Sequence, residues 1–168
     1  MPFNLLVKYN SLLSIEGMTV PQRKKSLKGV FDRDIRNNSD FSFRKKKINP
    51  TTADGEDSME RLFKHLTTVI TDKKNRRRDF ENSRSIRLHW IKYHLEELKK
   101  ENIYVFSVEE PEGKRTYIYD KEEEYIIVLE PLRMKPEYFL LSAYHLEGKD
   151  KARNKMMKKY GRRLQELL

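Results

Sequence analysis

The sequence predicts an α+β fold in which N-terminal helices are followed by a four-stranded antiparallel β-sheet and a basic C-terminal helix. Two observations support this order. Apolar residues recur at spacings of three and four in residues 1–36 and 57–100, as expected for helices. Between residues 102 and 146 the period changes to two, in short runs of β-branched and aromatic residues. The 168 residues suit one main domain (51–168), preceded by a helical segment and connector (1–50).

The N-terminal part is predicted to be helical to about residue 36, and "YNSLLSI" and "RKKSLKGVFDRDIRNN" carry its apolar spacing. The following stretch, "DFSFRKKKINPTTADGEDS", reads as a connector because it is rich in Pro, Gly, Thr and Asp. Within it, Phe41, Phe43 and Ile48 favour a short extended pairing.

The next helix is predicted to begin at Asp57, because Glu60 follows three residues later as in a capping box. It would run through "MERLFKHLTTVIT" and be followed by "DKKNRRRD", which we interpret as a solvated basic connector. A further helix is predicted over residues 81–100.

Four period-two runs then predict an antiparallel meander: "NIYVFSVEE", "RTYIYD", "EYIIVLE" and "YFLLSAYHL". The two central helices are expected to bury their apolar stripes on one face of this sheet. A basic helix, "KDKARNKMMKKYGRRLQELL", closes the chain.

The net charge of +10 and the pI of about 9.6 suit a nucleic acid or an anionic membrane surface as partner, and of the two we expect a nucleic acid. There is no cysteine, and the sequence contains no metal-ligand, P-loop or dinucleotide-binding motif, so neither a metal nor a cofactor is expected. No apolar run is long enough to span a bilayer, so no membrane partner is expected. The absence of cysteine fits a reducing cytoplasm.

Several polar residues are candidates for chemistry, and each has a structural alternative. His65 borders the apolar stripe of its helix, where half-burial holds a histidine pKa near neutrality, and Lys64 beside it points more fully to solvent. The alternative for His65 is a boundary histidine bonded to the backbone. Arg84 and Arg87 lie three apart on one helix face and can grip phosphate, although arginine pairs are usually solvated.

On the predicted second strand, Arg115 and Tyr117 share a side with Tyr119, which suits phosphate contact and base stacking as well as ordinary cross-strand packing. Ser142 is the small hydroxyl residue on its face of the last strand, where it donates to phosphate or lets a helix approach closely. The C-terminal cations, which include Lys149 and Arg153, contact phosphate or serve as a solubilising tail.

Five segments follow one another in the chain: "SMERLFKHLTT", "RSIRLHWIKYHLE", "RTYIYD", "EYIIVLE" and "YFLLSAYHLEGKDKARNKMMKKYGRR". In this order they resemble the phage-encoded barnase–EndoU–colicin–RelE-like nucleases, which share the BECR fold. The resemblance covers about residues 50–168. It implies catalytic roles for His65, Arg87, Arg115 and Ser142. From the patterns described above, the residues expected to bind substrate are Lys64, Arg84, Tyr117, Lys149 and Arg153.

The implied activity is that of a metal-independent endoribonuclease, with RNA as the partner and transfer RNA as one candidate substrate. The ribose 2′-hydroxyl attacks its own phosphate and leaves a 2′,3′-cyclic phosphate, with His65 as base or acid and the arginines stabilising the phosphorane. The resemblance also implies a toxin-like effector of a phage or mobile element, acting in the bacterial cytoplasm and neutralised by an acidic antitoxin or immunity protein. The alternatives are a non-catalytic nucleic-acid-binding module and a protein-interaction module that docks an acidic partner. The second proton-transfer group is left open among Tyr117, Thr67 and His145.

Overall fold

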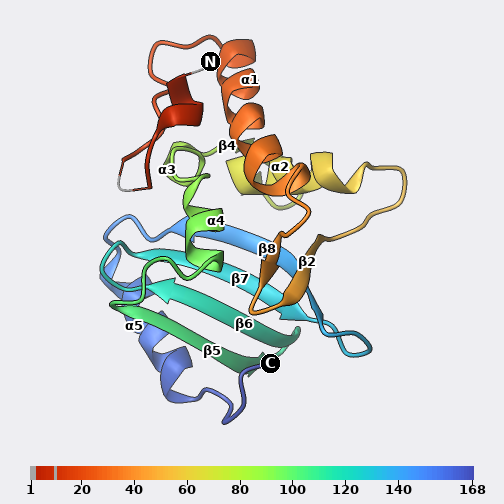
Figure 1. The fold of residues 1–168 in the computed structure, drawn as a ribbon, viewed down its shortest axis with the longest axis vertical. Coiled ribbons are helices and arrows are strands. Elements are labelled where there is room, and N and C mark those ends of the chain that lie inside the picture. Colours follow the sequence, from red (N-terminus) through yellow and green to blue (C-terminus); the bar gives the residue numbers. More distant parts are fainter. Residues whose placement is uncertain (1–2, 10) are drawn as a thin grey trace.

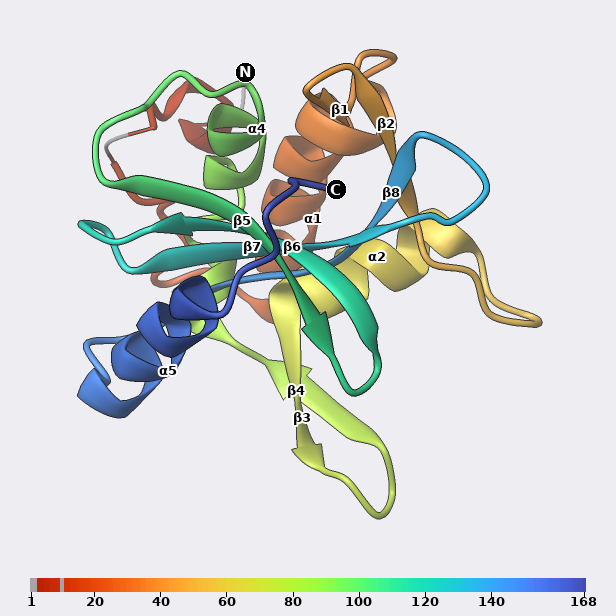
Figure 2. The same cartoon turned by 90° about the horizontal axis from the view of Figure 1, so that it is seen from below.

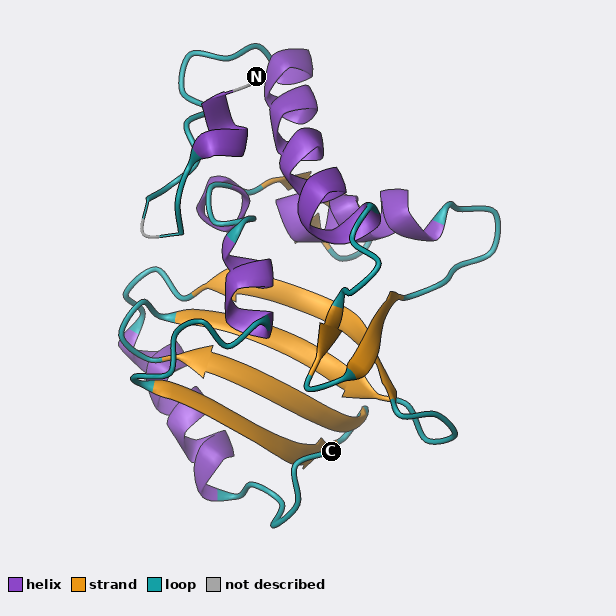
Figure 3. Cartoon of the chain, viewed as in Figure 1, coloured by secondary structure: helices purple, strands orange, loops and turns teal. Residues whose placement is uncertain are grey.

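The α+β class is confirmed by the computed structural model, which describes residues 3–9 and 11–168 (Figure 3). A curled sheet carries helices on one face and a single helix, α5 (Asp150–Gly161), on the other (Figure 1). The sheet has six strands in the order β1-β2-β8-β7-β6-β5. It is therefore mixed, and the prediction of four antiparallel strands is wrong.

The four predicted strands of the meander are all present. They are β5 (Ile103–Glu110), β6 (Gly113–Asp120), β7 (Tyr125–Pro131) and β8 (Glu137–His145), and each pairs antiparallel with the next. Gly113 begins β6 with φ 131°, in the left-handed region where a side chain is strained. The turns are short, as antiparallel neighbours require.

The two additional strands come from the region that we interpreted as a connector. β1 (Ser42–Phe43) and β2 (Lys46–Pro50) form the short pairing expected of Phe41, Phe43 and Ile48. β2 then pairs in parallel with the first half of β8, where Ile48 lies opposite Tyr138. This partner lies about ninety residues away in the chain, so local periodicity contains no signal for the pairing.

The helix that begins at Asp57 is confirmed, but it is shorter than predicted. α2 (Ser58–Thr67) starts where Asp57 accepts a hydrogen bond from the Glu60 amide, and it stops before the β-branched run Thr68-Val69-Ile70-Thr71. That run forms β3 (Thr68–Asp72), which pairs with β4 (Arg77–Phe80). The segment "DKKNRRRD" is therefore most of a hairpin, which projects from the rest of the molecule (Figure 2).

The single helix predicted over residues 81–100 is two short helices, α3 (Asn82–Ser85) and α4 (Trp90–Leu95). The break between them lets the His89 ring reach the carbonyl oxygens of Lys8 and Ser11, while Trp90 packs against Tyr125. A tertiary contact with the N-terminal segment thus overrides the helical period.

The N-terminal region is less helical than predicted. α1 (Val20–Phe31) is preceded by a 3-10 helix (Phe3–Leu6) and followed by a π-helical turn (Asp32–Arg36). The stretch "YNSLLSI" is not helical in residues 11–15, and Asn10 lies outside the described residues.

The sheet is buried on both faces. On one face, Ile118, Ile127 and Leu129 pack with residues of α1, α2 and α4 such as Phe31 and Leu62. Residues 1–50 and the main domain therefore share one hydrophobic cluster. On the other face, strand residues pack against α5: Phe106, Val108, Tyr119 and Ile126 meet Met156. No helix in the described part of the chain is long and apolar enough to cross a membrane.

Candidate nucleic-acid interface

A hollow of about 350 Å³ lies between α2 and the β3–β4 hairpin, and we call it the basic hollow. Its lining is dominated by cationic side chains and contains the predicted residues Lys64 and His65. The complete lining is Glu56, Arg61, Lys64, His65, Ile70, Lys73, Arg76 and Arg78.

The sequence builds one wall of the hollow through the amphipathic pattern of α2. The buried residues of the helix are Leu62, Phe63, Leu66 and Thr67, whereas Lys64 is exposed and His65 is half-buried at the edge of the apolar stripe. The other wall comes from the hairpin, because the β-branched run after Thr67 turns the chain into β3 immediately.

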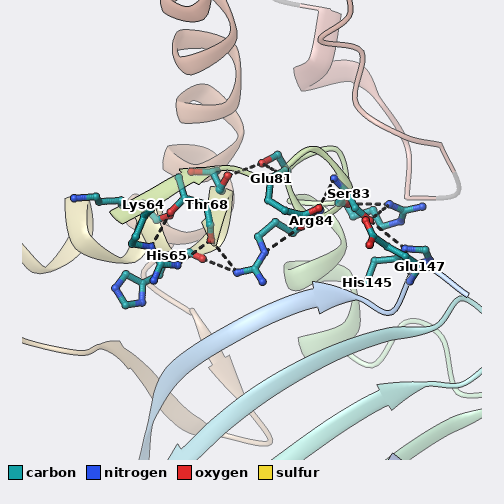
Figure 4. Close-up of polar contacts among 12 residues, drawn as sticks. Lys64, His65, Thr68, Glu81, Ser83, Arg84, His145 and Glu147 are labelled. Carbon is teal, nitrogen blue, oxygen red and sulfur yellow. Dashed lines mark hydrogen bonds and ion pairs between the residues drawn. The ribbon is translucent and has the colours of Figure 1, made fainter. Parts of the chain in front are cut away.

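Two guanidinium groups converge on the C-terminal end of α2. Arg78 donates to the Thr68 carbonyl oxygen at 2.8 Å and to its Oγ1 at 2.8 Å. Arg84 donates to the carbonyl oxygens of Thr68 at 3.1 Å and His65 at 3.0 Å (Figure 4). A helix C-terminus carries partial negative charge on its free carbonyl oxygens and so holds both cations in place.

His65 is half-buried, and its environment favours the neutral imidazole. Burial lowers its pKa to about 4, and the nearby charges of Arg78 and Arg61 lower the pKa in the same direction. Its ring forms no hydrogen bond with the described residues. At neutral pH the ring therefore has a nitrogen lone pair that is free to accept a proton.

The cations of the hollow are largely uncompensated. Arg61 pairs with Glu56 at 3.4 Å. Within residues 3–9 and 11–168, no ion pair is formed by Lys64, Lys73, Arg76 or Arg78. Because these side chains surround a neutral histidine, the hollow suits an anionic ligand that carries a proton to be removed.

Arg87 lies in a different cluster, with His145. Its Nη1 donates to Ser83 O at 2.8 Å and to Ser83 Oγ at 3.2 Å, and Ser83 Oγ contacts His145 Nδ1 at 3.1 Å. The Glu147 amide also donates to His145 Nδ1, at 3.1 Å. Nδ1 is thus an acceptor, and the neutral His145 ring carries its proton on Nε2. Figure 4 shows His65 at one side of the residues drawn and His145 at the other.

Arg115 and Tyr117 are engaged in contacts on the face of the sheet that carries α5. Arg115 forms an ion pair with Glu130 at 2.7 Å. Tyr117 is buried, donates to Glu110 at 2.9 Å and accepts from Lys159 at 2.9 Å. The ring is therefore not open to a stacking base, and the packing alternative describes this side of β6.

Ser142 lies on β8 opposite Val128, a residue that packs toward α5. No hydrogen bond or ion pair between described residues joins any two of His65, Arg87, Arg115 and Ser142. His65 lies in the basic hollow, Arg87 in the cluster with His145, and Arg115 in an ion pair with Glu130.

The cations of the C-terminal helix divide into paired and unpaired groups. Lys149 pairs with Glu147 at 3.6 Å, and Arg153 pairs with Glu124 at 2.9 Å. Lys151, Lys155 and Lys158 are exposed along one side of α5 and form no ion pair with the described residues. The two predicted substrate-binding residues are thus partly neutralised, whereas their lysine neighbours are not.

Sequence reasoning did not identify the hairpin cations Lys73, Arg76 and Arg78, because their segment was interpreted as a connector. The β-branched run "TTVIT" before this segment is the signal that could have indicated a strand and so a hairpin. The contact between Ser83 and His145 joins residues far apart in the chain, and no motif indicates it.

Comparison of the chain with protein-family models gave no match, and neither a curated protein nor a solved structure was found to be similar to it.

Proposed function

We propose that this protein is a metal-independent endoribonuclease that holds RNA in the basic hollow, with His65 as the general base. The observation that carries the proposal is a neutral imidazole, with its ring nitrogens free, among unpaired cations in one hollow. RNA brings to such a site both a phosphate, which needs positive charge, and a 2′-hydroxyl, which needs a base.

The reaction follows from these groups. His65 accepts the proton of a ribose 2′-hydroxyl as its oxygen bonds to the adjacent phosphorus, and the bond from phosphorus to the 5′-oxygen breaks. Arg78 stabilises the added negative charge of the phosphorane. Lys64 supplies a proton to the departing 5′-oxygen, because an arginine does not give up a proton under these conditions. The products are a 2′,3′-cyclic phosphate and a 5′-hydroxyl.

A pKa of about 4 makes His65 a weak base in the free protein, and binding of the substrate raises this pKa. A phosphodiester placed beside Arg78 offsets the positive charge that disfavours protonation of the ring. The pKa of His65 therefore rises toward neutrality in the complex, which is where a general base works best.

Of the residues expected from the sequence, His65, Lys64 and Arg84 remain in the proposed site. Arg78 takes the phosphorane role that the resemblance implies for Arg87 and Arg115. Arg84 acts as a positioning residue, because it holds the carbonyl oxygens at the end of α2.

The test is incubation of the purified protein with a structured RNA and an unstructured RNA in buffer containing EDTA. We expect cleavage of at least one of them, with ends that carry 2′,3′-cyclic phosphate and 5′-hydroxyl groups. The same RNA with 2′-O-methyl groups should remain intact, since it lacks the nucleophile. Cleavage of the methylated RNA, or intact RNA under every condition, would contradict the proposal.

A second candidate is a nucleic-acid-binding module without catalysis. The unpaired lysines on α5 favour it, because they lie on a helix surface that offers no histidine. In that case the wild-type protein would leave bound RNA intact, its binding to RNA would weaken steeply with salt, and His65→Gln would leave the affinity unchanged.

A further inference from the structure

The β3–β4 hairpin is a basic ribbon that stands apart from the main sheet. It forms a separate two-stranded sheet that projects from the body of the molecule (Figure 2). Its residues Ile70, Lys73, Arg76 and Arg78 line the basic hollow. The hairpin, residues 68–80, carries five cations against two carboxylates, Asp72 and Asp79. Four of the cations are exposed: Lys73, Lys74, Arg76 and Arg77.

The turn of the hairpin is held in one conformation by its own hydrogen bonds. Asp72 accepts from the amides of Lys74 at 3.0 Å and Asn75 at 3.3 Å, and from the Asn75 side chain at 2.8 Å. Arg76 has φ 53°, which completes the reversal. The cations are therefore displayed on an ordered support, which lowers the entropic cost of binding.

Cations lie on both sides of the ribbon. Arg76 and Arg78 line the basic hollow. Arg77 neighbours Arg78 in β4, so strand alternation directs Arg77 to the opposite side, where it forms an ion pair with Asp79 at 3.2 Å. A ribbon charged on both sides can meet two phosphate strands at once.

The hairpin lacks the groups that bind unpaired bases. Its aromatic residue is Phe80 at the base, and the Arg23 guanidinium covers that ring at 3.6 Å. Apart from the imidazole of His65, the lining of the basic hollow contains no aromatic residue. Proteins that bind single strands generally stack bases on aromatic side chains, so this surface is suited to phosphate backbone.

We propose that the β3–β4 hairpin binds the paired phosphate strands of a nucleic-acid double helix. This rests on the proposed function for its connection to cleavage: the duplex is a stem that positions an adjacent unpaired nucleotide in the basic hollow. The recognition itself depends on backbone geometry and charge, which RNA and DNA duplexes both supply, and the hairpin reads no base sequence.

The test measures binding separately from cleavage. The probes are a fluorescent 2′-O-methyl RNA duplex, a DNA duplex of the same sequence and the corresponding single RNA strand, each titrated over a series of salt concentrations. The variant is Lys74→Ser with Arg77→Ser, since neither residue lines the hollow. The matched control is Lys151→Ser with Lys155→Ser, which removes the same charge from α5.

We expect the wild-type protein to bind at least one duplex more tightly than the single strand, and comparison of the two duplexes tells which helix it prefers. In the hairpin variant, the slope of log affinity against log salt should fall by about 2, one for each phosphate contact removed. The α5 control should keep the wild-type slope. Equal losses in the two variants, or tighter binding of the single strand, would overturn the proposal.

The two proposals fail differently. Duplex binding that depends on the hairpin, without any cleavage of RNA, would leave the hairpin site standing and remove the ribonuclease. Cleavage of RNA by a hairpin variant with wild-type duplex affinity would support the ribonuclease and remove the hairpin site. A thermal melt of each variant confirms that these exposed substitutions leave the fold intact.

Discussion

His65 differs from the other three histidines in the bonding of its ring. His89 contacts the carbonyl oxygens of Lys8 and Ser11, and His94 contacts Trp90 O and Asp120. His145 is held by Ser83 and the Glu147 amide. These three rings position other groups, whereas the His65 ring makes no hydrogen bond to the described residues.

The pKa of His65 should be measurable by a histidine NMR titration. We expect a value of about 4 in the free protein, with an increase when inorganic phosphate is added. Arg78→Gln should also raise the pKa of His65, because it removes a neighbouring positive charge. His145 serves as the internal control, since its pKa is lowered by burial and by Arg87. An ordinary value near 6.5 for His65 in the free protein would contradict this description of the hollow.

The same pKa shift predicts how stability depends on pH. The pKa of His65 is lower in the folded protein than in the unfolded chain, so acid favours the unfolded state. Its contribution to stability is complete above about pH 6.5 and is lost as the pH falls toward about 4. Urea unfolding across this range should show a steeper decline for the wild type than for His65→Gln. Parallel curves would show that His65 titrates normally.

At the scale of elements, local signals in the sequence are enough to predict the strands of the meander and the start of α2. Each strand has a period of two and a short turn, and Asp57 caps α2 as its spacing with Glu60 suggests. The end of α2 was missed because Leu66, Val69 and Ile70 continue the helical spacing. The helix nevertheless ends at Thr67, because the β-branched residues that follow favour extended backbone. Thr68 is extended, with φ −133°.

The start of α1 depends on a capping box that sequence reasoning overlooked. Thr19 Oγ1 accepts from the Gln22 amide at 3.3 Å, and Gln22 Oε1 accepts from the Thr19 amide at 2.9 Å. We expect Thr19→Ala to lower the free energy of unfolding by about 1 kcal/mol, because it leaves helix amides unsatisfied. Thr19→Ser retains the hydroxyl and should cost much less in the same urea titration. Equal stability of the alanine variant and the wild type would argue against the cap.

At the scale of the whole molecule, the sequence contains no local signal for the contacts that assemble the sheet and the site. β2 joins β8 across about ninety residues, and Arg84 reaches the carbonyl oxygen of His65 across nineteen. Such pairings depend on the complete fold, because the sequence of neither segment indicates which segment it will contact. The candidate residues His65 and Lys64 were therefore predictable as outward helix positions, whereas Arg78 as their neighbour was not.

A buried polar network ties the N-terminal segment to the sheet. The Asp120 carboxylate is fully buried and accepts from Lys99 at 3.0 Å and from Tyr9 at 3.1 Å, and it contacts His94 at 2.9 Å. We expect Asp120→Asn to lower the free energy of unfolding by about 3 kcal/mol, because it leaves a partly buried ammonium group without its anion. Glu122→Gln removes an exposed carboxylate near the same lysine and should change stability by no more than about 0.5 kcal/mol. If chemical denaturation gave both variants a similar loss in the free energy of unfolding, the buried contacts of Asp120 would not be the source of the stability.

The most direct test of the central claim compares two histidine variants in single-turnover cleavage of RNA. His65→Gln removes the proposed base, and His145→Gln removes a histidine of similar burial that lies beside Arg87 instead. We predict that His65→Gln lowers the rate by about a hundredfold or more, whereas His145→Gln keeps it within a few-fold of the wild type. A rate that depends on His145 and not on His65 would contradict the account and move the chemistry to the Arg87 cluster.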